Sequence, residues 1–171
     1  MTEIIELLDT HGPALFGLLY RVTLRDDVAE DLMQELFLKL RVSKKFRTAT
    51  CPLAYARRTA LHLAFDWRRK RAALPGVELA DHELSDNRPS PLEHLIEAER
   101  VQAALEAMAS LSARSCELLT LRYIQHQSYE ALAQECHKTP HQVRALCHKA
   151  LIQLRKLLAG ASTGTDKGDK L

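Results

Sequence analysis

Residues 139–149 carry hydrogen-bond donors and cations at the spacing expected of a helix that contacts nucleic acid. The side chains on the outer face of this helix would be His141, Gln142, Arg144, His148 and Lys149. Such side chains can reach phosphates and base edges when a helix lies in a groove of duplex DNA. The alternative is an ordinary helical hairpin whose basic outer face is only solvated. The short turn and the donors crowded into the first turns of the helix favour DNA binding.

The elements that would position these donors are two helices joined by a turn at residues 137–139. Thr139 and Gln142 form a capping box around Pro140 at the first helical position, which marks a sharp helix start. The inner stripe of this second helix is Val143, Leu146, Cys147, Ala150, Leu151, Leu154, Leu157 and Leu158. Ser128 caps the first helix, whose inner face is Tyr129, Leu132, Ala133 and Cys136. The pattern predicts a helix-turn-helix.

An acidic surface is predicted on a helix that runs from Asp27 to about Leu40. Asp27 and Glu30 have the spacing of a capping box, and apolar residues recur at helical spacing behind them. The exposed face carries Asp31, Gln34 and Glu35. Carboxylates repel phosphate, so a protein partner is favoured over DNA here, and a merely solvated face is about equally compatible with these residues.

A basic loop with one aromatic residue follows at residues 41–47. Its side chains of interest are Lys44, Lys45, Phe46 and Arg47. The cations could neutralise phosphates while the ring stacks on an unpaired base. Phe46 could equally anchor the loop to the core, and the sequence leaves these two alternatives open.

A helix over residues 52–71 has an unusual polar face. Arg58, His62, Asp66 and Arg69 follow one another at helical spacing, and the helix ends in the run Arg68, Arg69, Lys70 and Arg71. A catalytic pair of His62 and Asp66 lacks a neighbouring nucleophile, so a ladder of ion pairs explains the spacing more simply. Four consecutive cations exceed what a helix C-terminus needs, which favours phosphate contact.

Composition limits the class of protein. The chain has 171 residues and a net charge of only +2, so a nucleic-acid surface must come from local segregation of charge. No signal peptide or long apolar run is present, which predicts a soluble, cytoplasmic protein. The four cysteines form no CxxC pair, and reduced thiols are expected.

The pattern predicts an all-α fold of two small helical domains. The first covers residues 1–71, with its first two helices broken at residues 11–13. The proline-rich, acidic stretch 72–91 reads as a flexible linker. A four-helix domain follows at residues 92–159, and residues 160–171 form a disordered tail.

Three segments together resemble the extracytoplasmic-function group of bacterial sigma-70 factors. The helix DDVAEDLMQELFLKL resembles region 2.1 to 2.2, PLAYARRTALHLAFDWRRKR resembles region 2.3 to 2.4, and the helix-turn-helix with its preceding helix resembles region 4. The resemblance implies a binding protein without catalysis or cofactor. Its implied partners are the clamp helices and flap of core RNA polymerase and promoter DNA. Whether an anti-sigma factor holds it inactive stays open.

The resemblance also implies a role for each candidate residue. Core polymerase would be bound by Asp31, Gln34 and Glu35. The melted −10 element would be held by Lys44, Lys45, Phe46, Arg47, Arg58, His62, Arg68, Arg69, Lys70 and Arg71, with a flipped base captured by the basic loop around Phe46. The −35 duplex would be held by Thr139, His141, Gln142, Arg144, His148 and Lys149.

This chain departs from the family pattern at three positions in the helices that carry these residues. Leu61 and His62 stand where the family usually has Arg and Asn, and Leu146 replaces a common Arg of the recognition helix. An atypical promoter preference is therefore expected.

Two other functions remain as alternatives. A helix-turn-helix regulator that acts as a homodimer would bind a palindrome but would leave the acidic face and the basic loop unused. A metal site could use cysteines and histidines of the helix-turn-helix: Cys136, His137, His141, Cys147 and His148. The turn between them and the inward positions of both cysteines disfavour a shared site.

Overall fold

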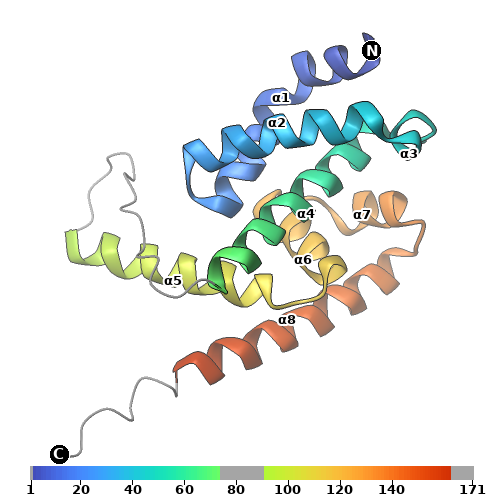
Figure 1. The fold of residues 1–171 in the computed structure, drawn as a ribbon. Helices are drawn as coiled ribbons and strands as arrows, with labels where there is room; N and C mark the ends of the chain where they lie inside the picture. The colour runs from blue at the N-terminus through green and yellow to red at the C-terminus, as the bar shows by residue number, and fades with distance from the viewer. Residues whose placement is uncertain (1, 74–90, 163–171) are drawn as a thin grey trace, which may run out of the picture. The chain divides into compact units, whose positions relative to one another are not determined.

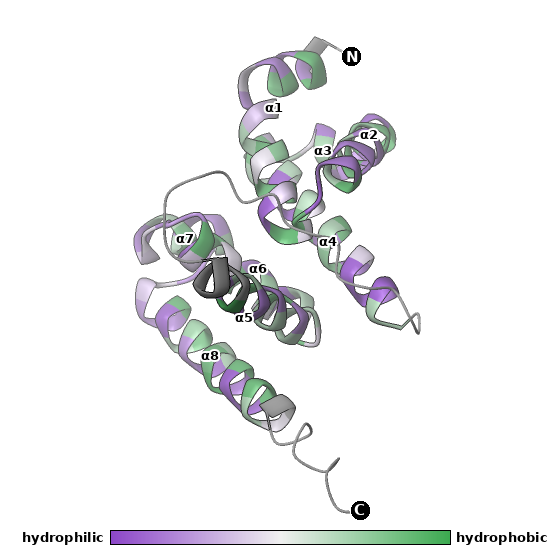
Figure 2. Cartoon of the chain, turned by 90° about the vertical axis from the view of Figure 1, so that its left-hand side faces the viewer, coloured by the Kyte–Doolittle hydropathy of each residue, from purple (hydrophilic) through white to green (hydrophobic). Residues whose placement is uncertain are grey.

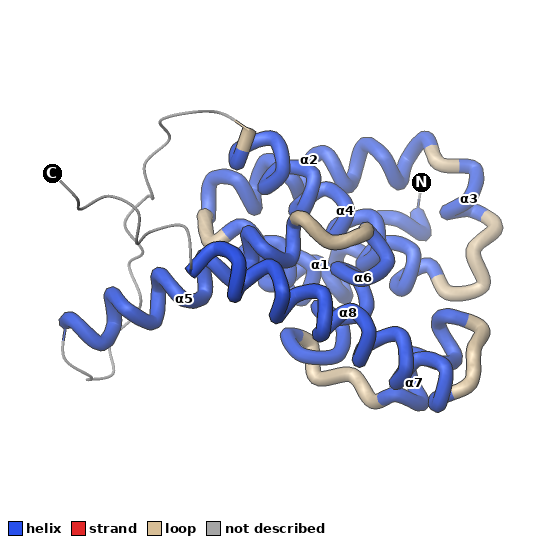
Figure 3. The backbone as a smooth tube through the Cα atoms, turned by 90° about the horizontal axis from the view of Figure 1, so that it is seen from below, coloured by secondary structure: helices blue, strands red, loops and turns tan. Residues whose placement is uncertain are grey.

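The computed structural model describes residues 2–73 and 91–162, and every regular element in these two ranges is a helix (Figure 3). Contacts divide the chain into two units, Met1–Val77 with Tyr123–His126, and Glu78–Arg122 with Gln127–Leu171. The predicted all-α fold with two small helical domains is confirmed. The predicted linker lies outside the described residues except at its two ends, and the predicted domain limits stay predictions.

The first unit contains α1 (Thr2–Thr23), α2 (Asp26–Val42), α3 (Lys44–Arg47) and α4 (Pro52–Ala72) (Figure 1). α1 packs against α2 and α4, α2 packs against α4, and the short α3 packs against α4. Apolar and polar residues alternate along each helix at helical spacing (Figure 2). The largest fully buried side chains of this unit are Leu15, Leu18, Leu19, Val22, Leu36, Leu40, Phe46, Leu61 and Phe65.

α1 is one continuous helix, so the predicted break at residues 11–13 is wrong. Pro13 lies inside the helix with its side chain exposed. Proline removes one backbone hydrogen bond and crowds the preceding turn, which is why a break was expected. Ile4 and Leu7 before it and Leu15 after it are all buried. Burial on both sides of the proline outweighs the lost bond.

The start of α2 also differs from its prediction, because Asp27 and Glu30 do not form a capping box. Arg25 occupies the N-cap position without a side-chain cap. Its Nε donates a hydrogen bond to Asp27 Oδ1 at 3.0 Å, and its Nη2 donates to Oδ2 at 2.5 Å. This pairing lowers the pKa of the Asp27 carboxyl, mainly through the side-chain hydrogen bond. Asp26 and Asp27 still favour the helix start through the macrodipole.

α4 begins at Pro52, as predicted, and supplies much of the core of the first unit. Its buried residues are Ala56, Ala60, Leu61, Leu63, Ala64, Phe65 and Arg68. The three alanines let neighbouring helices approach closely, because a methyl group occupies little space. Leu53 and Trp67 are only half-buried.

Arg68 is the unusual member of this buried set, with 4% of its surface exposed. Its Nε donates a hydrogen bond to the backbone carbonyl of Val22, near the end of α1. A buried charge is costly unless it is hydrogen-bonded, so this contact is what makes the burial tolerable. Arg68 therefore fastens the last turns of α4 to α1.

The second unit contains α5 (Pro91–Ala109), α6 (Ala113–Leu119), α7 (Tyr129–Cys136) and α8 (Pro140–Ser162). The long α8 packs against α5, α6 and α7. α6 is continued by a π-helical turn, η1 (Thr120–Ile124), where the hydrogen-bond register of the helix changes.

The helix-turn-helix forms as predicted. Ser128 Oγ accepts a hydrogen bond from Ala131 N at 3.0 Å, which caps α7. α7 ends where His137 adopts the left-handed conformation, with φ 50° and ψ 48°. Lys138 N then donates to Ala133 O at 2.9 Å, which closes the C-terminal turn.

The capping box at the start of α8 is confirmed. Gln142 N donates to Thr139 Oγ1 at 3.2 Å, and Thr139 N donates to Gln142 Oε1 at 3.1 Å. Two backbone donors that α8 itself cannot satisfy are thereby paired.

The core of the second unit follows most of the predicted stripe of α8. Val143, Cys147 and Ala150 are buried, whereas Leu157 is 40% exposed, so its predicted burial is wrong. The helix also continues to Ser162, beyond the predicted start of the tail at residue 160, and the rest of the tail lies outside the described residues. Within the described ranges, no helix is long and apolar enough to cross a membrane.

We expect Arg68→Met to lower the free energy of unfolding by about 1 to 3 kcal/mol, because the buried Val22 carbonyl loses its donor. Chemical denaturation followed by circular dichroism measures the change. Lys70→Met is the matched control, since it removes the same charge from an exposed position of the same helix. It should change stability by less than about 0.5 kcal/mol. Equal effects of the two substitutions would contradict a structural role for Arg68.

Candidate protein and nucleic-acid binding surfaces

The acidic face of α2 is exposed at all three predicted positions, Asp31, Gln34 and Glu35. Glu35 Oε1 lies 3.0 Å from Lys39 Nζ in an exposed ion pair, which solvent screens. The face is therefore open to a partner.

The same face continues into two exposed apolar side chains that the sequence reasoning missed. Leu38 is 51% exposed and Val42 is 72% exposed. Asp31, Glu35, Leu38 and Val42 follow one another at helical spacing, and we call these four residues the α2 stripe. That spacing from Asp31 was the signal that could have found them. A stripe that is acidic at one end and apolar at the other suits a protein partner better than DNA.

The basic loop contains the short helix α3, and its aromatic residue points inward. Phe46 is 1% exposed, and its ring centroid lies 6.0 Å from that of Tyr55. Ser43 Oγ accepts from Phe46 N at 3.2 Å and lies 3.0 Å from the Tyr55 hydroxyl oxygen. The ring is thus a core anchor, which decides against stacking of a base on Phe46, the other alternative that the sequence left open. Capture of a flipped base by the basic loop around it stays a prediction.

The cations around Phe46 remain exposed, as predicted. Lys44, Lys45 and Arg47 are all exposed, and Arg47 Nη2 donates to Arg41 O at 3.2 Å. Burying one ring in the middle of α3 directs its charged neighbours outward. α3 packs against α4, so these cations adjoin the helix that carries the other predicted contacts.

On α4 the predicted contact residues differ in their exposure, from exposed through half-buried to buried. Arg58, His62 and Lys70 are exposed, and Arg69 is half-buried and forms an ion pair with Asp66. The Arg71 guanidinium carbon lies 5.3 Å from the centre of the Trp67 ring. Arg68 is buried against α1, so its predicted phosphate contact is wrong. Asp66 pairs with Arg69 three residues on, which is one step of the predicted ladder.

The departures from the family pattern have different consequences on α4 and α8. Leu61 is 1% exposed and belongs to the core, so it cannot contact DNA in any sequence-dependent way. His62 beside it is exposed, so its side chain can contact DNA. Leu146 is half-buried on the side of α8 that faces α6.

The six residues predicted to contact duplex DNA are all exposed on the helix-turn-helix: Thr139, His141, Gln142, Arg144, His148 and Lys149. Two of them are already engaged, because the Thr139 hydroxyl and the Gln142 carbonyl oxygen accept the bonds of the capping box. His141 and His148 lie near the middle of the outer face by helical spacing.

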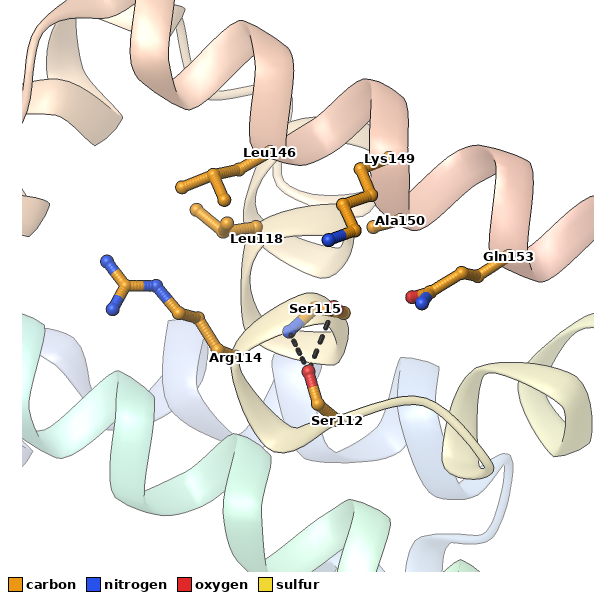
Figure 4. A pocket seen from close by; sticks show the side chains of 8 residues that line it. All are labelled: Ser112, Arg114, Ser115, Leu118, Leu146, Lys149, Ala150 and Gln153. Atoms are coloured by element: carbon orange, nitrogen blue, oxygen red, sulfur yellow. Dashed lines mark hydrogen bonds between the residues drawn. The ribbon is translucent and has the colours of Figure 1, made fainter.

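The two cations among these six residues, Arg144 and Lys149, lie on opposite flanks of that outer face. Lys149 lines a cavity of about 210 Å³ between α8 and α6, together with Arg114 (Figure 4). The floor of the cavity is apolar, and its other polar lining residues are Ser112, Ser115 and Gln153. Arg144 instead lies over the ring of Tyr129 at the start of α7, with its guanidinium carbon 5.1 Å from the ring centre. Sequence reasoning missed Arg114 and Tyr129, because neither lies on the predicted outer face.

A metal site finds no support in the described part of the chain. No three histidine, cysteine or acidic side chains there lie close enough together to hold an ion. Cys147 is buried, and this burial raises the pKa of its thiol although Arg122 acts to lower it. A thiol must lose its proton to bind a metal, so this environment opposes ligation.

Comparison with known families now decides the class of protein. Residues 7–73 match the model of sigma-70 region 2, and residues 107–156 match that of sigma-70, region 4. These two stretches together make up more than half of the chain. The chain belongs to the sigma-70 family. Both regions occur in the order and at the places that the two helical units occupy.

Individual relatives include a sigma factor of the extracytoplasmic-function group. The chain is 25% identical over 163 residues to the ECF RNA polymerase sigma factor SigX of Bacillus subtilis. That match covers 91% of this chain and 84% of SigX. The chain is 35% identical over 115 residues to a probable RNA polymerase sigma factor, RfaY, of Xanthomonas campestris pv. campestris. That match covers 63% of this chain but only 28% of RfaY.

A solved structure shares the fold. It is the sigma factor RpoE of Bartonella quintana in complex with the anti-sigma factor NepR, with a TM-score of 0.52 and 20% identity. The similarity covers 93% of this chain and 98% of that one. At this identity it supports the fold alone.

Substitution of Phe46 tests its role as an anchor. We expect Phe46→Ala to destabilise the first unit by about 3 to 5 kcal/mol, and Phe46→Leu by no more than about 1.5 kcal/mol. Urea denaturation measures both changes. Promoter opening by the Leu variant, followed by permanganate footprinting with core polymerase, should stay close to that of the unmodified chain. A Leu variant that is stable but cannot hold the promoter open would restore the stacking role.

Proposed function

We propose that this protein directs core RNA polymerase to specific promoters and assists the opening of the promoter, acting by binding and without catalysis. The observation that carries the proposal is the combination, in one chain, of the two sigma-70 regions with two surfaces of opposite character. An acidic and apolar stripe lies on α2, and basic surfaces lie on α3, α4 and α8. Core polymerase and promoter DNA are the partners, and the cytoplasm is where both are found.

The α2 stripe binds core polymerase in this proposal. Asp31, Gln34 and Glu35 supply polar and charged contacts, which favour a partner surface that is basic. Leu38 and Val42 supply apolar area that is costly to leave in water. The partner would therefore be an amphipathic element, with cations opposite Glu35 and an apolar patch opposite Val42. This fits the clamp helices that the family resemblance implies.

The basic residues of α3 and α4 hold the opened −10 strand. The residues we assign to this surface are Lys44, Lys45, Arg47, Arg58, His62, Arg69, Lys70 and Arg71. Single strands are held chiefly by cations along the backbone and by stacking. Phe46 and Arg68 are excluded from the surface by their burial, so their contribution is to hold α3 and α4 in shape.

The recognition helix α8 holds the −35 duplex from both flanks. Arg144 on one side and Lys149 with Arg114 on the other are spaced across the outer face, where they can meet phosphates on either side of a groove. His141 and His148 between them face the base edges. Thr139 and Gln142 shape the start of the helix, and the amide nitrogen of Gln142 remains available to a base or phosphate.

A regulator that acts as a homodimer is the weaker alternative. It would use only the second unit and would leave the α2 stripe and the basic loop without a role. The RpoE relative forms a complex with the anti-sigma factor NepR, so an inhibitory protein is a further candidate partner.

The decisive experiment is run-off transcription with core polymerase on a promoter library. The proposal predicts factor-dependent transcripts from promoters that share a −10 and a −35 element. Failure to co-purify with core polymerase would contradict it. So would tight binding to palindromic duplexes in the absence of core, which would favour the homodimeric regulator instead.

Opposite effects of two substitutions test the division of labour between the units. Arg144→Ala should weaken binding to the −35 duplex by roughly 1 to 3 kcal/mol and leave core binding unchanged. Glu35→Lys should lower core affinity about tenfold by repelling a basic partner surface, with duplex contacts unchanged. Both affinities can be measured by fluorescence anisotropy. If the two variants lose core binding equally, the assignment of the surfaces is wrong.

The apolar end of the α2 stripe gives a separate test. Leu38→Ser should weaken core binding by roughly three- to tenfold, because about half of an apolar side chain is no longer buried by the partner. The free energy of unfolding should change little, since Leu38 is 51% exposed already. Ile5→Ser is the matched control on α1, where the side chain is 49% exposed and lies outside the stripe. Core binding that responds equally to both substitutions would argue against a contact at Leu38.

A further inference from the structure

Tyr129 occupies a fixed position at the entrance to the helix-turn-helix. It is the first residue of α7, directly after the Ser128 cap, whose hydroxyl accepts from Ala131 N at 3.0 Å. The side chain is half-buried, so one part of the ring packs on the unit while another part remains accessible. A ring held in this way is a rigid platform, because a tyrosine has only two side-chain torsions.

Two guanidinium groups share this platform. The guanidinium carbon of Arg122 lies 4.6 Å from the ring centre, and that of Arg144 lies 5.1 Å from it. Arg122 Nη1 also donates to the Gln127 carbonyl at 2.9 Å, which ties this arginine to the loop before α7. The faces of the ring carry partial negative charge and attract cations. Attraction to the ring therefore offsets the repulsion between two like charges.

Arg144 depends on this ring more than Arg122 does. Within the described residues no carboxylate forms an ion pair with Arg144. An exposed arginine without such a contact samples many rotamers, and fixing it on binding costs about 2 kcal/mol of side-chain entropy. A guanidinium already resting on a ring has lost part of that freedom in the free protein, so less is lost when DNA binds.

We propose that Tyr129 is a positioning residue that holds the Arg144 guanidinium on one flank of the recognition helix, ready for a phosphate or base edge of the duplex. The inference rests on the proposed −35 binding by α8 and adds a residue to it that lies outside the recognition helix. The ring does the positioning and the hydroxyl does not, because the attraction comes from the aromatic face. Arg122 sets where Arg144 rests by occupying another part of the same ring.

The test uses the full chain assembled with core polymerase and the promoter selected in the run-off library. Tyr129→Leu should weaken promoter affinity roughly two- to fivefold, the size of effect expected from one exposed cation–aromatic contact. Tyr129→Phe should retain nearly the original affinity, since it keeps the ring. Tyr123→Leu is the matched control, because it removes an exposed tyrosine from η1, whereas the ring beneath the Arg144 guanidinium is that of Tyr129.

A double-mutant cycle separates positioning from support of the fold. In an Arg144→Ala background, Tyr129→Leu should cause no further loss of affinity. A loss that persists in that background would show that Tyr129 acts only by stabilising α7 and would overturn the inference. Equal losses for Tyr129→Phe and Tyr129→Leu, or unchanged or tighter binding by the Leu variant, would overturn it as well. If the unmodified chain with core polymerase selects no promoter, the proposed function itself fails.

Discussion

Each unit depends on one long helix that must serve as a packing centre and as a binding surface at the same time. α4 contacts α1, α2 and α3, and α8 contacts α5, α6 and α7. A helix that is packed on several sides has only a narrow strip left for a ligand. α4 packs against several helices through small residues, since Ala56, Ala60 and Ala64 allow close approach of neighbouring helices. On α8, Val143, Cys147 and Ala150 play the same part. The cations must then occupy whatever strip remains.

Much of the local structure could be predicted from the sequence, because it depends on residues that are close together along the chain. The two helix caps of the helix-turn-helix depend on residues three apart, so Ser128 and Thr139 could be assigned as caps without any knowledge of the fold. Helical spacing likewise predicted which face of α8 is exposed. The acidic face of α2 followed from the same periodicity. These features are set within one or two turns of helix, where tertiary contacts seldom override the pattern.

Three of the errors arose where contacts beyond the local pattern decide the environment of a residue. Arg68 and Lys70 are chemically alike and two positions apart, yet only Arg68 meets a buried carbonyl, that of Val22. Phe46 could stack or anchor until Tyr55 and Ser43 were seen to enclose it. Pro13 was expected to end a helix because no local signal reports the core contacts on both of its sides. In each case the deciding energy is burial, which sequence spacing alone does not measure.

Under the proposed function, the small number of cations among the predicted −35 contacts of the second unit has a consequence for promoter binding. Two capping residues are partly occupied, Leu146 replaces a cation, and Arg144 and Lys149 are left on opposite flanks. Few phosphate contacts imply a weak affinity for duplex and a shallow dependence on salt. Joining this unit to a second DNA-binding unit converts one weak contact into an intramolecular one, which can raise affinity by roughly 10² to 10⁴ without any new contact. A recognition helix that binds weakly then favours specificity, because neither the −10 nor the −35 element alone retains the polymerase. A DNA site that offers only one of these two elements releases it.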